Sequence, residues 1–326
     1  MPIFTGLSKS LGGTEKETPK QQYFYGLVQK HVLVTGANGQ LGSEIKAITA
    51  RMNLPFRFIF TDADSVDITD IRQIDAFVAA HGIQYLINCA AYTAVDRAET
   101  DVEKATAINA TAVANIAQVA VKYGVKVIHI STDFVFDGAS AVPYKETTAA
   151  HPLSVYGKTK LAGEEALQAA GGDWIILRTS WLYSEYGTNF VKTMIRLMRE
   201  RERLTVVDDQ RGSPTYAADL AEMVIHILQF TEEQEWKTGI YHFSNKGDTT
   251  WFGFAKEIKK LAGITTCELI PISSDEYPSA ARRPAYSVMD LSNTSSAFHV
   301  EIPAWEEALA RCINKILTNK ADCRSL

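Results

Sequence analysis

The chain has little cysteine and no long apolar segment, and these two shortages exclude several classes of protein. Four cysteines occur in 326 residues, and no two of them form a C-x-x-C motif. This usage argues against a disulfide framework or a zinc site and favours a reducing, cytoplasmic location. No apolar run approaches the roughly 18 residues needed to cross a bilayer, and no secretory signal is recognisable, so we expect no membrane association.

The chain also lacks a strong excess of one charge, low-complexity tracts and internal repeats. With 33 basic and 38 acidic side chains, the formal net charge is −5, which gives no reason to expect a nucleic-acid partner. Hydrophobic residues make up 46% of the chain and charged residues 22%, as in ordinary globular proteins. The length predicts two domains, or one large α/β unit with a subdomain.

The beginning of the chain differs from the rest. Residues 12–18 are polar and resemble a loop, and no apolar core follows before residue 30. We expect residues 1–29 to form a partly disordered N-terminal extension. The alternative is an ordered segment around Tyr23, Phe24 and Tyr25 that packs on a neighbour.

From residue 30 onward, short apolar segments typical of strands alternate with amphipathic segments typical of helices. The expected strands are Lys30–Thr35, Phe56–Phe60, Tyr85–Asn88, Lys126–Ile130 and Trp174–Leu177. The expected helices between them are Leu41–Arg51, Ile71–Ala80, Val102–Tyr123 and Ser154–Ala169. This alternation predicts an α/β fold with a Rossmann-type, doubly wound parallel sheet covered on both faces.

After Arg178 the pattern loosens into shorter elements. We expect helices at Asn189–Arg201, Ala217–Gln229, Trp251–Leu261 and Pro303–Leu317, and strands at Leu204–Val207 and Ile240–Phe243. The segment Ala217–Phe243 is expected to return and complete the first sheet. The dinucleotide-binding domain would then comprise residues 30–179 plus about 216–248. A smaller, discontinuous substrate-binding domain would comprise about 180–215 plus 249–326.

A glycine-rich loop separates the first expected strand from the first helix. Gly36, Gly39 and Gly42 have the spacing G-x-x-G-x-x-G, which differs from the G-x-G-x-x-G of other dinucleotide folds. Glycines permit a tight turn and let the backbone approach a pyrophosphate, while a helix N-terminus offers free N–H groups. The loop predicts dinucleotide binding, and plain turn chemistry is the alternative.

Acidic residues after the second strand suggest where the adenosine would lie. Asp62 can accept hydrogen bonds from a ribose and would repel a 2′-phosphate, so NADH is mildly preferred over NADPH. Arg57 could still come close to this end of the cofactor, which leaves NADPH open, and a solvated turn is the alternative for Asp62. The pair Asp67-Ile68 could hold the adenine, or the carboxylate could cap the next helix.

The third strand ends in small residues. Asn88 is followed by Cys89, Ala90, Ala91 and Tyr92. Such residues leave room for a cofactor that lies across the strand ends. The same pattern suits a well-packed strand end equally well.

Tyr156 and Lys160 lie four residues apart near the start of an expected helix, so they share one face. The spacing carries no weight alone, because such a pair is expected by chance and could be a surface pair. Thr132, however, ends the preceding strand 24 residues upstream of Tyr156. A nearby ammonium stabilises a phenolate and lowers the tyrosine pKa, and a threonine hydroxyl can orient a substrate oxygen. These parts, in this order, favour hydride transfer to a carbonyl.

These residues resemble the extended short-chain dehydrogenase/reductase family. The resemblance covers nearly the whole chain after Lys30 and is strongest in six ordered stretches: NCAAYTAVDRAE (88–99), STDFVFDG (131–138), VYGKTKLAGE (155–164), RTSWLYSEYGTNFVKTM (178–194), VVDDQRGSPTY (206–216) and RRPAYSVMD (282–290). Phe134 stands where the family often has tyrosine. The extension before residue 30 is not part of the family pattern.

The resemblance implies a role for each matching residue. Gly39, Gln40 and Leu41 would contact the cofactor phosphates, Asp62, Asp67 and Ile68 the adenosine, and Ala90, Ala91 and Tyr92 the middle of the cofactor. Thr132, Asp133 and Trp181 would contact a sugar, and Arg282 and Arg283 could pair with a nucleotide diphosphate. Tyr156 would donate the proton, with Lys160 as its partner.

The implied activity is NAD(P)H-dependent reduction of the C4 ketone of a nucleotide sugar, with dTDP as the expected nucleotide and UDP or GDP left open. A related nucleotide-sugar reductase, epimerase or dehydratase is the first alternative, although a dehydratase would need a glutamate where Asp133 stands. A non-catalytic, nucleotide-binding regulatory subunit is the second. A homodimer is a further expectation, and no metal site is assigned.

Overall fold

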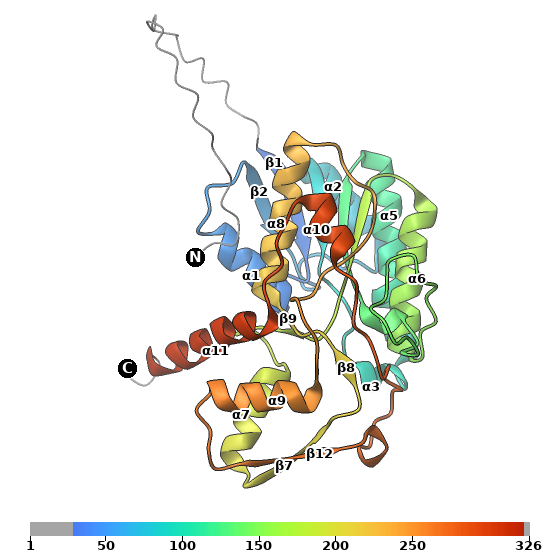
Figure 1. The fold of residues 1–326 in the computed structure, drawn as a ribbon. Helices are drawn as coiled ribbons and strands as arrows, with labels where there is room; N and C mark the ends of the chain where they lie inside the picture. The colour runs from blue at the N-terminus through green and yellow to red at the C-terminus, as the bar shows by residue number, and fades with distance from the viewer. Residues whose placement is uncertain (1–28, 323–326) are drawn as a thin grey trace, which may run out of the picture.

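The computed structural model describes residues 29–322 (Figure 1), so the expectations for residues 1–28 lie outside the described residues. Six parallel strands form the central sheet in the order β10-β5-β4-β3-β1-β2. They are β1 (Lys30–Thr35), β2 (Phe56–Phe60), β3 (Ile83–Asn88), β4 (Lys126–Thr132), β5 (Trp174–Thr179) and β10 (Gly239–His242). The predicted parallel α/β fold is confirmed, and β10 completes the sheet beside β5 as expected.

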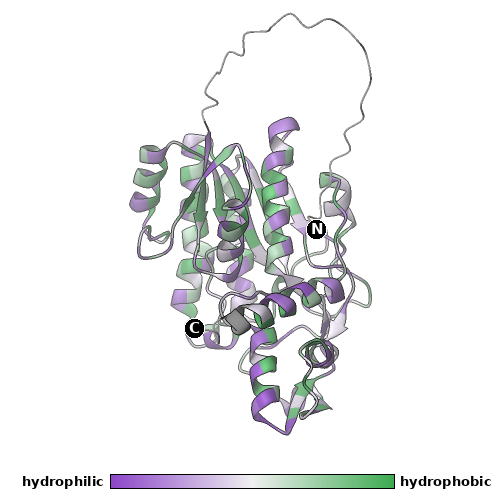
Figure 2. Cartoon of the chain, turned by 90° about the vertical axis from the view of Figure 1, so that its left-hand side faces the viewer, coloured by the Kyte–Doolittle hydropathy of each residue, from purple (hydrophilic) through white to green (hydrophobic). Residues whose placement is uncertain are grey.

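Helices cover both faces of this sheet. One face carries α1 (Gln40–Thr49), α8 (Ala217–Glu233) and α10 (Ser292–Phe298), and the other carries α2 (Ile71–His81), α5 (Ala112–Tyr123) and α6 (Val155–Ala170). Alternate strand residues face opposite sides: Val32 and Val34 pack under α1 and α8, whereas Leu33 packs under α2 and α5. Figure 2 shows the resulting apolar strands between helices with polar outer faces.

The long helix expected over Val102–Tyr123 is interrupted. Within this range the structure has α4 (Val102–Thr106), a π-helical turn at Ala107–Thr111, and then α5. A short helix, α3 (Val95–Ala98), precedes them. The wider turn contains the buried Asn109, whose side chain bonds the backbone N–H and C=O of Tyr92 at 2.8 and 3.1 Å. Such π turns often mark functional sites.

A smaller layer lies below the large sheet in the view of Figure 1. It contains α7 (Phe190–Glu200), β7 (Arg203–Val207), α9 (Trp251–Leu261), β12 (Glu268–Ile272) and α11 (Trp305–Asp322). Short pairs connect it: β6 (Leu182–Tyr183) with β9 (Thr215–Tyr216), and β8 (Arg211–Gly212) with β11 (Thr249–Thr250). Strand β12, which pairs with β7, was not predicted from the sequence; it contains Pro271, and proline is rare within strands.

The chain near its end crosses back to the large sheet. Thr294 on α10 donates to the carbonyl of His242 at 2.6 Å. Phe298, Val300 and Ile302 are buried in the core beneath α8. The two-domain division of the chain stays a prediction, and this return packs residues 292–302 with the first sheet.

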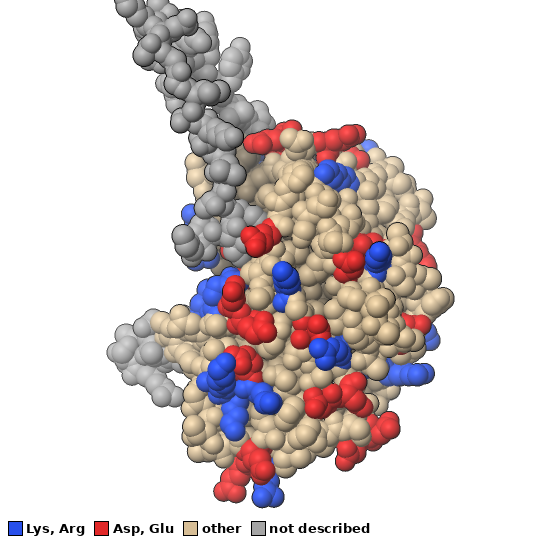
Figure 3. Space-filling view, in the orientation of Figure 1, with Lys and Arg blue, Asp and Glu red and all other residues tan. Residues whose placement is uncertain are grey.

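The described surface mixes both charges. Figure 3 shows basic and acidic side chains interspersed over one face. Between residues 29 and 322, no helix has the length and apolar character needed to cross a membrane.

A buried carboxyl pair joins α1 to the small layer. Glu44 on α1 is 1% exposed and shares a hydrogen bond with Glu185, which follows β6. Ser184 donates to Glu44 at 2.7 Å, and Lys315 on α11 donates to Glu185 at 2.9 Å. Burial and the neighbouring carboxylate raise the pKa of Glu44 to about 8, because both disfavour its charged form.

We expect this carboxyl to make stability pH-dependent. The native state keeps a proton on Glu44 that the unfolded chain releases above its ordinary pKa of 4.5. The free energy of unfolding should therefore fall as pH rises from about 5 to about 8, by about 1 kcal/mol per unit. In Glu44→Gln this contribution should vanish, as measured by urea unfolding across that range. Glu200→Gln, at an exposed position on α7, is the control. Equal slopes in wild type and Glu44→Gln would refute the expectation.

Candidate active site

The glycine-rich loop follows β1 and packs against the loop after β3. Gly36 has a φ of +65°, and a Cβ there would lie 2.7 Å from the backbone nitrogen of Ala90. A Cβ on Gly42 would lie 2.5 Å from the carbonyl oxygen of Gly36. Both positions therefore require glycine. The two loops meet where the strand order reverses between β1 and β3, which is where open α/β sheets bind ligands.

The first turn of α1 is free to bind an anion. Gly39 is its N-cap and provides no side-chain acceptor for the first N–H groups of the helix. These N–H groups, on Gln40 and Leu41, remain available to donate hydrogen bonds, and the helix dipole adds partial positive charge. The glycine cradle and the uncapped N-terminus fit the pyrophosphate of a dinucleotide.

Of the predicted adenosine residues, Asp62 lies beside this loop. Asp62 accepts a hydrogen bond from the backbone N–H of Asn38 at 3.0 Å, so its carboxylate is held next to the glycine loop. Asp67 accepts from the N–H and hydroxyl of Thr69 at 2.9 and 2.7 Å, and Ile68 is buried. The alternative that Asp67 caps α2 is wrong, because Asp70 is that cap.

The predicted proton-transfer residues meet at the carboxyl end of β4. Thr132 ends this strand, and its hydroxyl is in hydrogen-bond contact with Tyr156 of α6. Two features bring α6 this close. Ser154 caps the helix by accepting from the N–H of Gly157 at 3.2 Å, and a Cβ on Gly157 would lie 2.2 Å from the carbonyl oxygen of Phe134. The ring of Phe134 packs edge-on against Tyr156, with centroids 5.5 Å apart.

The expected lowering of the tyrosine pKa by the lysine is not found. Burial raises the pKa of Tyr156 to about 12, despite its contact with Thr132. Lys160 donates to the carbonyl of Ile130 at 2.6 Å, and burial lowers its own pKa to about 8. The physical reason is that burial of Tyr156 disfavours the charged phenolate more than the hydrogen bond with Thr132 favours it. Burial also raises the pKa of Asp133 to about 6.

Several polar residues of the site were missed from the sequence. Asn88 and His129 are fully buried and bonded to each other at 3.0 Å, and Asn109 holds the backbone of Tyr92. Glu164 and Arg178 form a buried ion pair with 2.6 Å between Oε2 and Nη2. The available signal was a polar residue at a position where the strand or helix pattern requires an apolar one.

Trp181 has an unusual backbone conformation, with a φ of +46°. Its ring stacks on Trp251 with centroids 3.6 Å apart, and Gly212 leaves space for it, since a Cβ there would lie 2.6 Å from the ring. A non-glycine residue in this region stores strain that the surroundings must hold. Such strain is typical of ligand sites.

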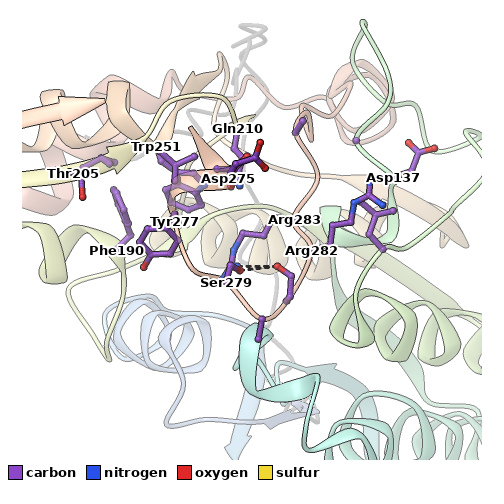
Figure 4. A pocket seen from close by; sticks show the side chains of 18 of the residues that line it. Asp137, Phe190, Thr205, Gln210, Trp251, Asp275, Tyr277, Ser279, Arg282 and Arg283 are labelled. Carbon is purple, nitrogen blue, oxygen red and sulfur yellow. Dashed lines mark hydrogen bonds between the residues drawn. The ribbon is translucent and has the colours of Figure 1, made fainter. Parts of the chain in front are cut away.

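A cavity of about 850 Å³ lies next to these groups (Figure 4). Phe190, Trp251 and Tyr277 line one side, and Arg282 and Asp137 line the other. Its lining residues include Leu153 but not Thr132, Tyr156 or Lys160, so the cavity adjoins the reacting groups rather than containing them.

Two neighbouring arginines differ in their engagement. Arg283 pairs with Asp96 at 2.6 Å and also donates to Ser279 and the carbonyl of Ala281. Arg282 lines the same cavity, and within residues 29–322 no hydrogen bond or ion pair engages it. Across that same range, no cluster of three or more His, Cys, Asp or Glu residues is placed to hold a metal ion.

Comparisons with known proteins agree with this arrangement. The family model described as RmlD substrate binding domain matches residues 30–318. A dTDP-4-dehydrorhamnose reductase of Aggregatibacter actinomycetemcomitans is 39% identical, covering 85% of this chain and 96% of its own. A solved dTDP-4-dehydrorhamnose reductase of Clostridium acetobutylicum superposes with a TM-score of 0.83 at 38% identity, covering 88% and 99% of the two chains. A dTDP-4-dehydrorhamnose reductase from Bacillus anthracis, solved in complex with NADP, superposes with a TM-score of 0.82 at 39% identity. The match covers 88% of this chain and 100% of that one.

Two glycine variants separate backbone strain from the loop contact. Gly36 and Gly82 both have positive φ, but a Cβ on Gly82 would meet nothing within 4 Å. Gly82→Ala should cost about 1–2 kcal/mol of stability and leave dinucleotide binding intact. Gly36→Ala should cost roughly 3 kcal/mol or more and weaken binding at least about tenfold, because its Cβ pushes the two loops apart. Urea unfolding and fluorescence titration with NADPH measure both effects. Wild-type binding by folded Gly36→Ala would contradict this interpretation.

Proposed function

This chain belongs to the family of the RmlD substrate binding domain, and we propose that it reduces the C4 ketone of dTDP-4-dehydro-β-L-rhamnose with NAD(P)H, giving dTDP-β-L-rhamnose. It is an oxidoreductase of dTDP-rhamnose biosynthesis. One observation carries the proposal: Thr132, Tyr156 and Lys160 assemble at the same sheet edge as the glycine cradle.

The dinucleotide would lie across the carboxyl ends of β1, β2 and β3. The free N–H groups of Gln40 and Leu41 would bind its phosphates, and Asp62 would accept from the adenosine ribose. Asp67 and Ile68 would border the adenine, and Ala90, Ala91 and Tyr92 the middle of the molecule. When bound, NAD(P)H supplies the hydride for the sugar carbonyl carbon.

The protein's own groups handle the proton. With its pKa at about 12, Tyr156 is protonated at neutral pH and is therefore in the donating form. It would protonate the oxygen at C4 while Thr132 donates a hydrogen bond to the same oxygen. Lys160, when charged, would stabilise the phenolate that remains.

The adjoining cavity would take the nucleotide end of the substrate. Trp181 and Asp133 would contact the sugar, and the aromatic wall of Phe190, Trp251 and Tyr277 offers surfaces for stacking. For the diphosphate, Arg282 is free to bind, whereas Arg283 would first have to leave Asp96.

Three finer points are also proposals. The carboxylate of Asp62 beside the glycine loop supports a mild preference for NADH, since it would repel a 2′-phosphate. A homodimer and a cytoplasmic location stay predictions.

The test of this function follows the oxidation of NADH and of NADPH with dTDP-4-dehydrorhamnose generated in situ, and identifies the product by mass and NMR. We expect dTDP-rhamnose. Tyr156→Phe should lower kcat by about 10²–10⁴ while leaving dinucleotide binding unchanged. Tyr123→Phe, at the exposed end of α5, is the matched control. Full activity of Tyr156→Phe would refute its role, and no turnover by wild type that binds both ligands would refute the reaction.

The arginines give a separate prediction about substrate affinity. Arg282→Ala should raise the KM for the nucleotide sugar at least about tenfold, because a charged hydrogen bond to phosphate is lost. The Kd for NAD(P)H should not change. Arg196→Ala, an exposed arginine on α7, controls for loss of positive charge. An unchanged KM would show that another group binds the diphosphate.

A further inference from the structure

A row of buried polar side chains crosses three neighbouring strands beneath the site. Thr35 pairs with Asn88 in the register of β1 and β3, and Asn88 pairs with His129 in the register of β3 and β4. Their exposed fractions are 2%, 0% and 0%. Lys160 reaches the row from α6, with its Nζ 3.5 Å from Nε2 of His129. The row thus connects the strand before the glycine loop with the lysine.

Asn88 sets the direction of the hydrogen bonds in this row. Its Oδ1 accepts from the hydroxyl of Thr35 at 2.7 Å and from the N–H of Ala90 at 3.3 Å. A backbone N–H can only donate, so the amide oxygen must face Ala90 and the amide nitrogen must face His129. Nδ2 of Asn88 then donates to Nδ1 of His129 at 3.0 Å. Nδ1 of the imidazole therefore carries no proton.

The remaining nitrogen of His129 must carry the ring's proton. Burial and the charge of Lys160 lower the pKa of His129 well below its usual range, so the ring is neutral. A neutral imidazole has one N–H, and with Nδ1 as acceptor it is on Nε2. Nε2 is the atom that faces Nζ of Lys160. A neutral amine can accept this hydrogen bond through its lone pair, whereas an ammonium group is repelled by it.

We propose that His129 is a positioning residue of this site, which holds a fixed Nε2–H donor against Nζ of Lys160. Nζ of Lys160 also donates to the carbonyl of Ile130 at 2.6 Å, so the amine lies between the imidazole of His129 and this carbonyl. The lysine then gives up its proton at lower pH than an exposed lysine does. The importance of this lowered lysine pKa for catalysis rests on the function proposed above for Lys160. The position and charge of the amine do not depend on that function.

The other groups around Lys160 do not account for the lowering of its pKa that we assign to His129. Glu164, on the same helix, favours the ammonium form but is itself bound by Arg178. Cys89, after β3, stays a thiol because burial raises its pKa to about 12. Burial acts in the same direction as His129 and lowers the pKa of the lysine to about 8. The contribution of His129 therefore has to be separated from burial by variants that leave the amine buried.

Two substitutions at this position separate the donor from the packing. In His129→Asn, the side-chain oxygen can still accept from Asn88, but no donor reaches Lys160. In His129→Gln, the amide nitrogen reaches about as far as Nε2 and keeps a donor there. The readout is the titration of the ε-carbon of Lys160 by NMR, in full-length protein labelled with ε-¹³C lysine and measured without ligands. Lys160→Met assigns the signal.

We expect Lys160 of the wild type to titrate near pH 8. His129→Asn should move this titration upward by about half a unit or more, and His129→Gln should leave it within a few tenths of a unit. An unchanged titration in His129→Asn would overturn the proposal, and so would a ¹⁵N histidine spectrum that places the ring proton on Nδ1.

A second variant keeps the test decisive where His129→Asn does not fold. Asn88→Leu removes the donor to Nδ1 of His129, so the ring can turn its lone pair toward Lys160. The titration of Lys160 should then move upward as in His129→Asn. An unchanged titration of Lys160 would again refute the proposal. Because this titration needs no turnover, its outcome is independent of the reductase assay. Absence of reductase activity together with the expected shift would refute the proposed function and leave the role of His129 in setting the lysine's charge intact.

Discussion

The buried ion pair between Glu164 and Arg178 holds the helix that carries the reacting groups against the sheet. Arg178, on β5, donates from Nε and Nη2 to both carboxylate oxygens at 2.6–3.2 Å, and Ser131 on β4 donates to the same carboxylate. The two side chains are 3% and 0% exposed, so removal of either would leave a buried charge at a cost of about 3–5 kcal/mol. Because Glu164 lies one turn beyond Lys160, the pair also fixes where Tyr156 and Lys160 meet β4.

The parallel sheet places the other parts of the site at the same edge. Carboxyl ends of parallel strands lie together, so loops separated by many residues in sequence become neighbours. Glycine makes these approaches close: Gly36 against Ala90, Gly157 against Phe134, and Gly163 against the carbonyl oxygen of Asn109, which a Cβ would approach to 2.1 Å. The geometry of the site thus depends on missing side chains as much as on reactive ones.

The sequence predicted the parts of this site that are local. The glycine loop, the strand end at Thr132 and the Tyr156–Lys160 helix follow from residue order and strand–helix alternation. The partners of buried polar groups did not follow, because Asn88 and His129 meet only through strand register, and Arg283 meets Asp96 across 187 residues of sequence. The π turn around Asn109 was likewise not predicted, because the apolar spacing of the segment indicates only a helix. The tyrosine pKa was predicted in the wrong direction, since a sequence does not reveal desolvation.

In the proposed reaction, hydride passes from a dinucleotide at the glycine loop to C4 of a nucleotide-linked sugar beside Tyr156. Its most direct test is transfer of label. The protein is incubated with dTDP-4-dehydrorhamnose and reduced NAD(P) that carries deuterium at the transferable position, and the product is examined by NMR. We expect one deuterium at C4 of the rhamnose in each product molecule. Product with hydrogen from solvent at C4, or no label transfer by protein that binds both ligands, would contradict it.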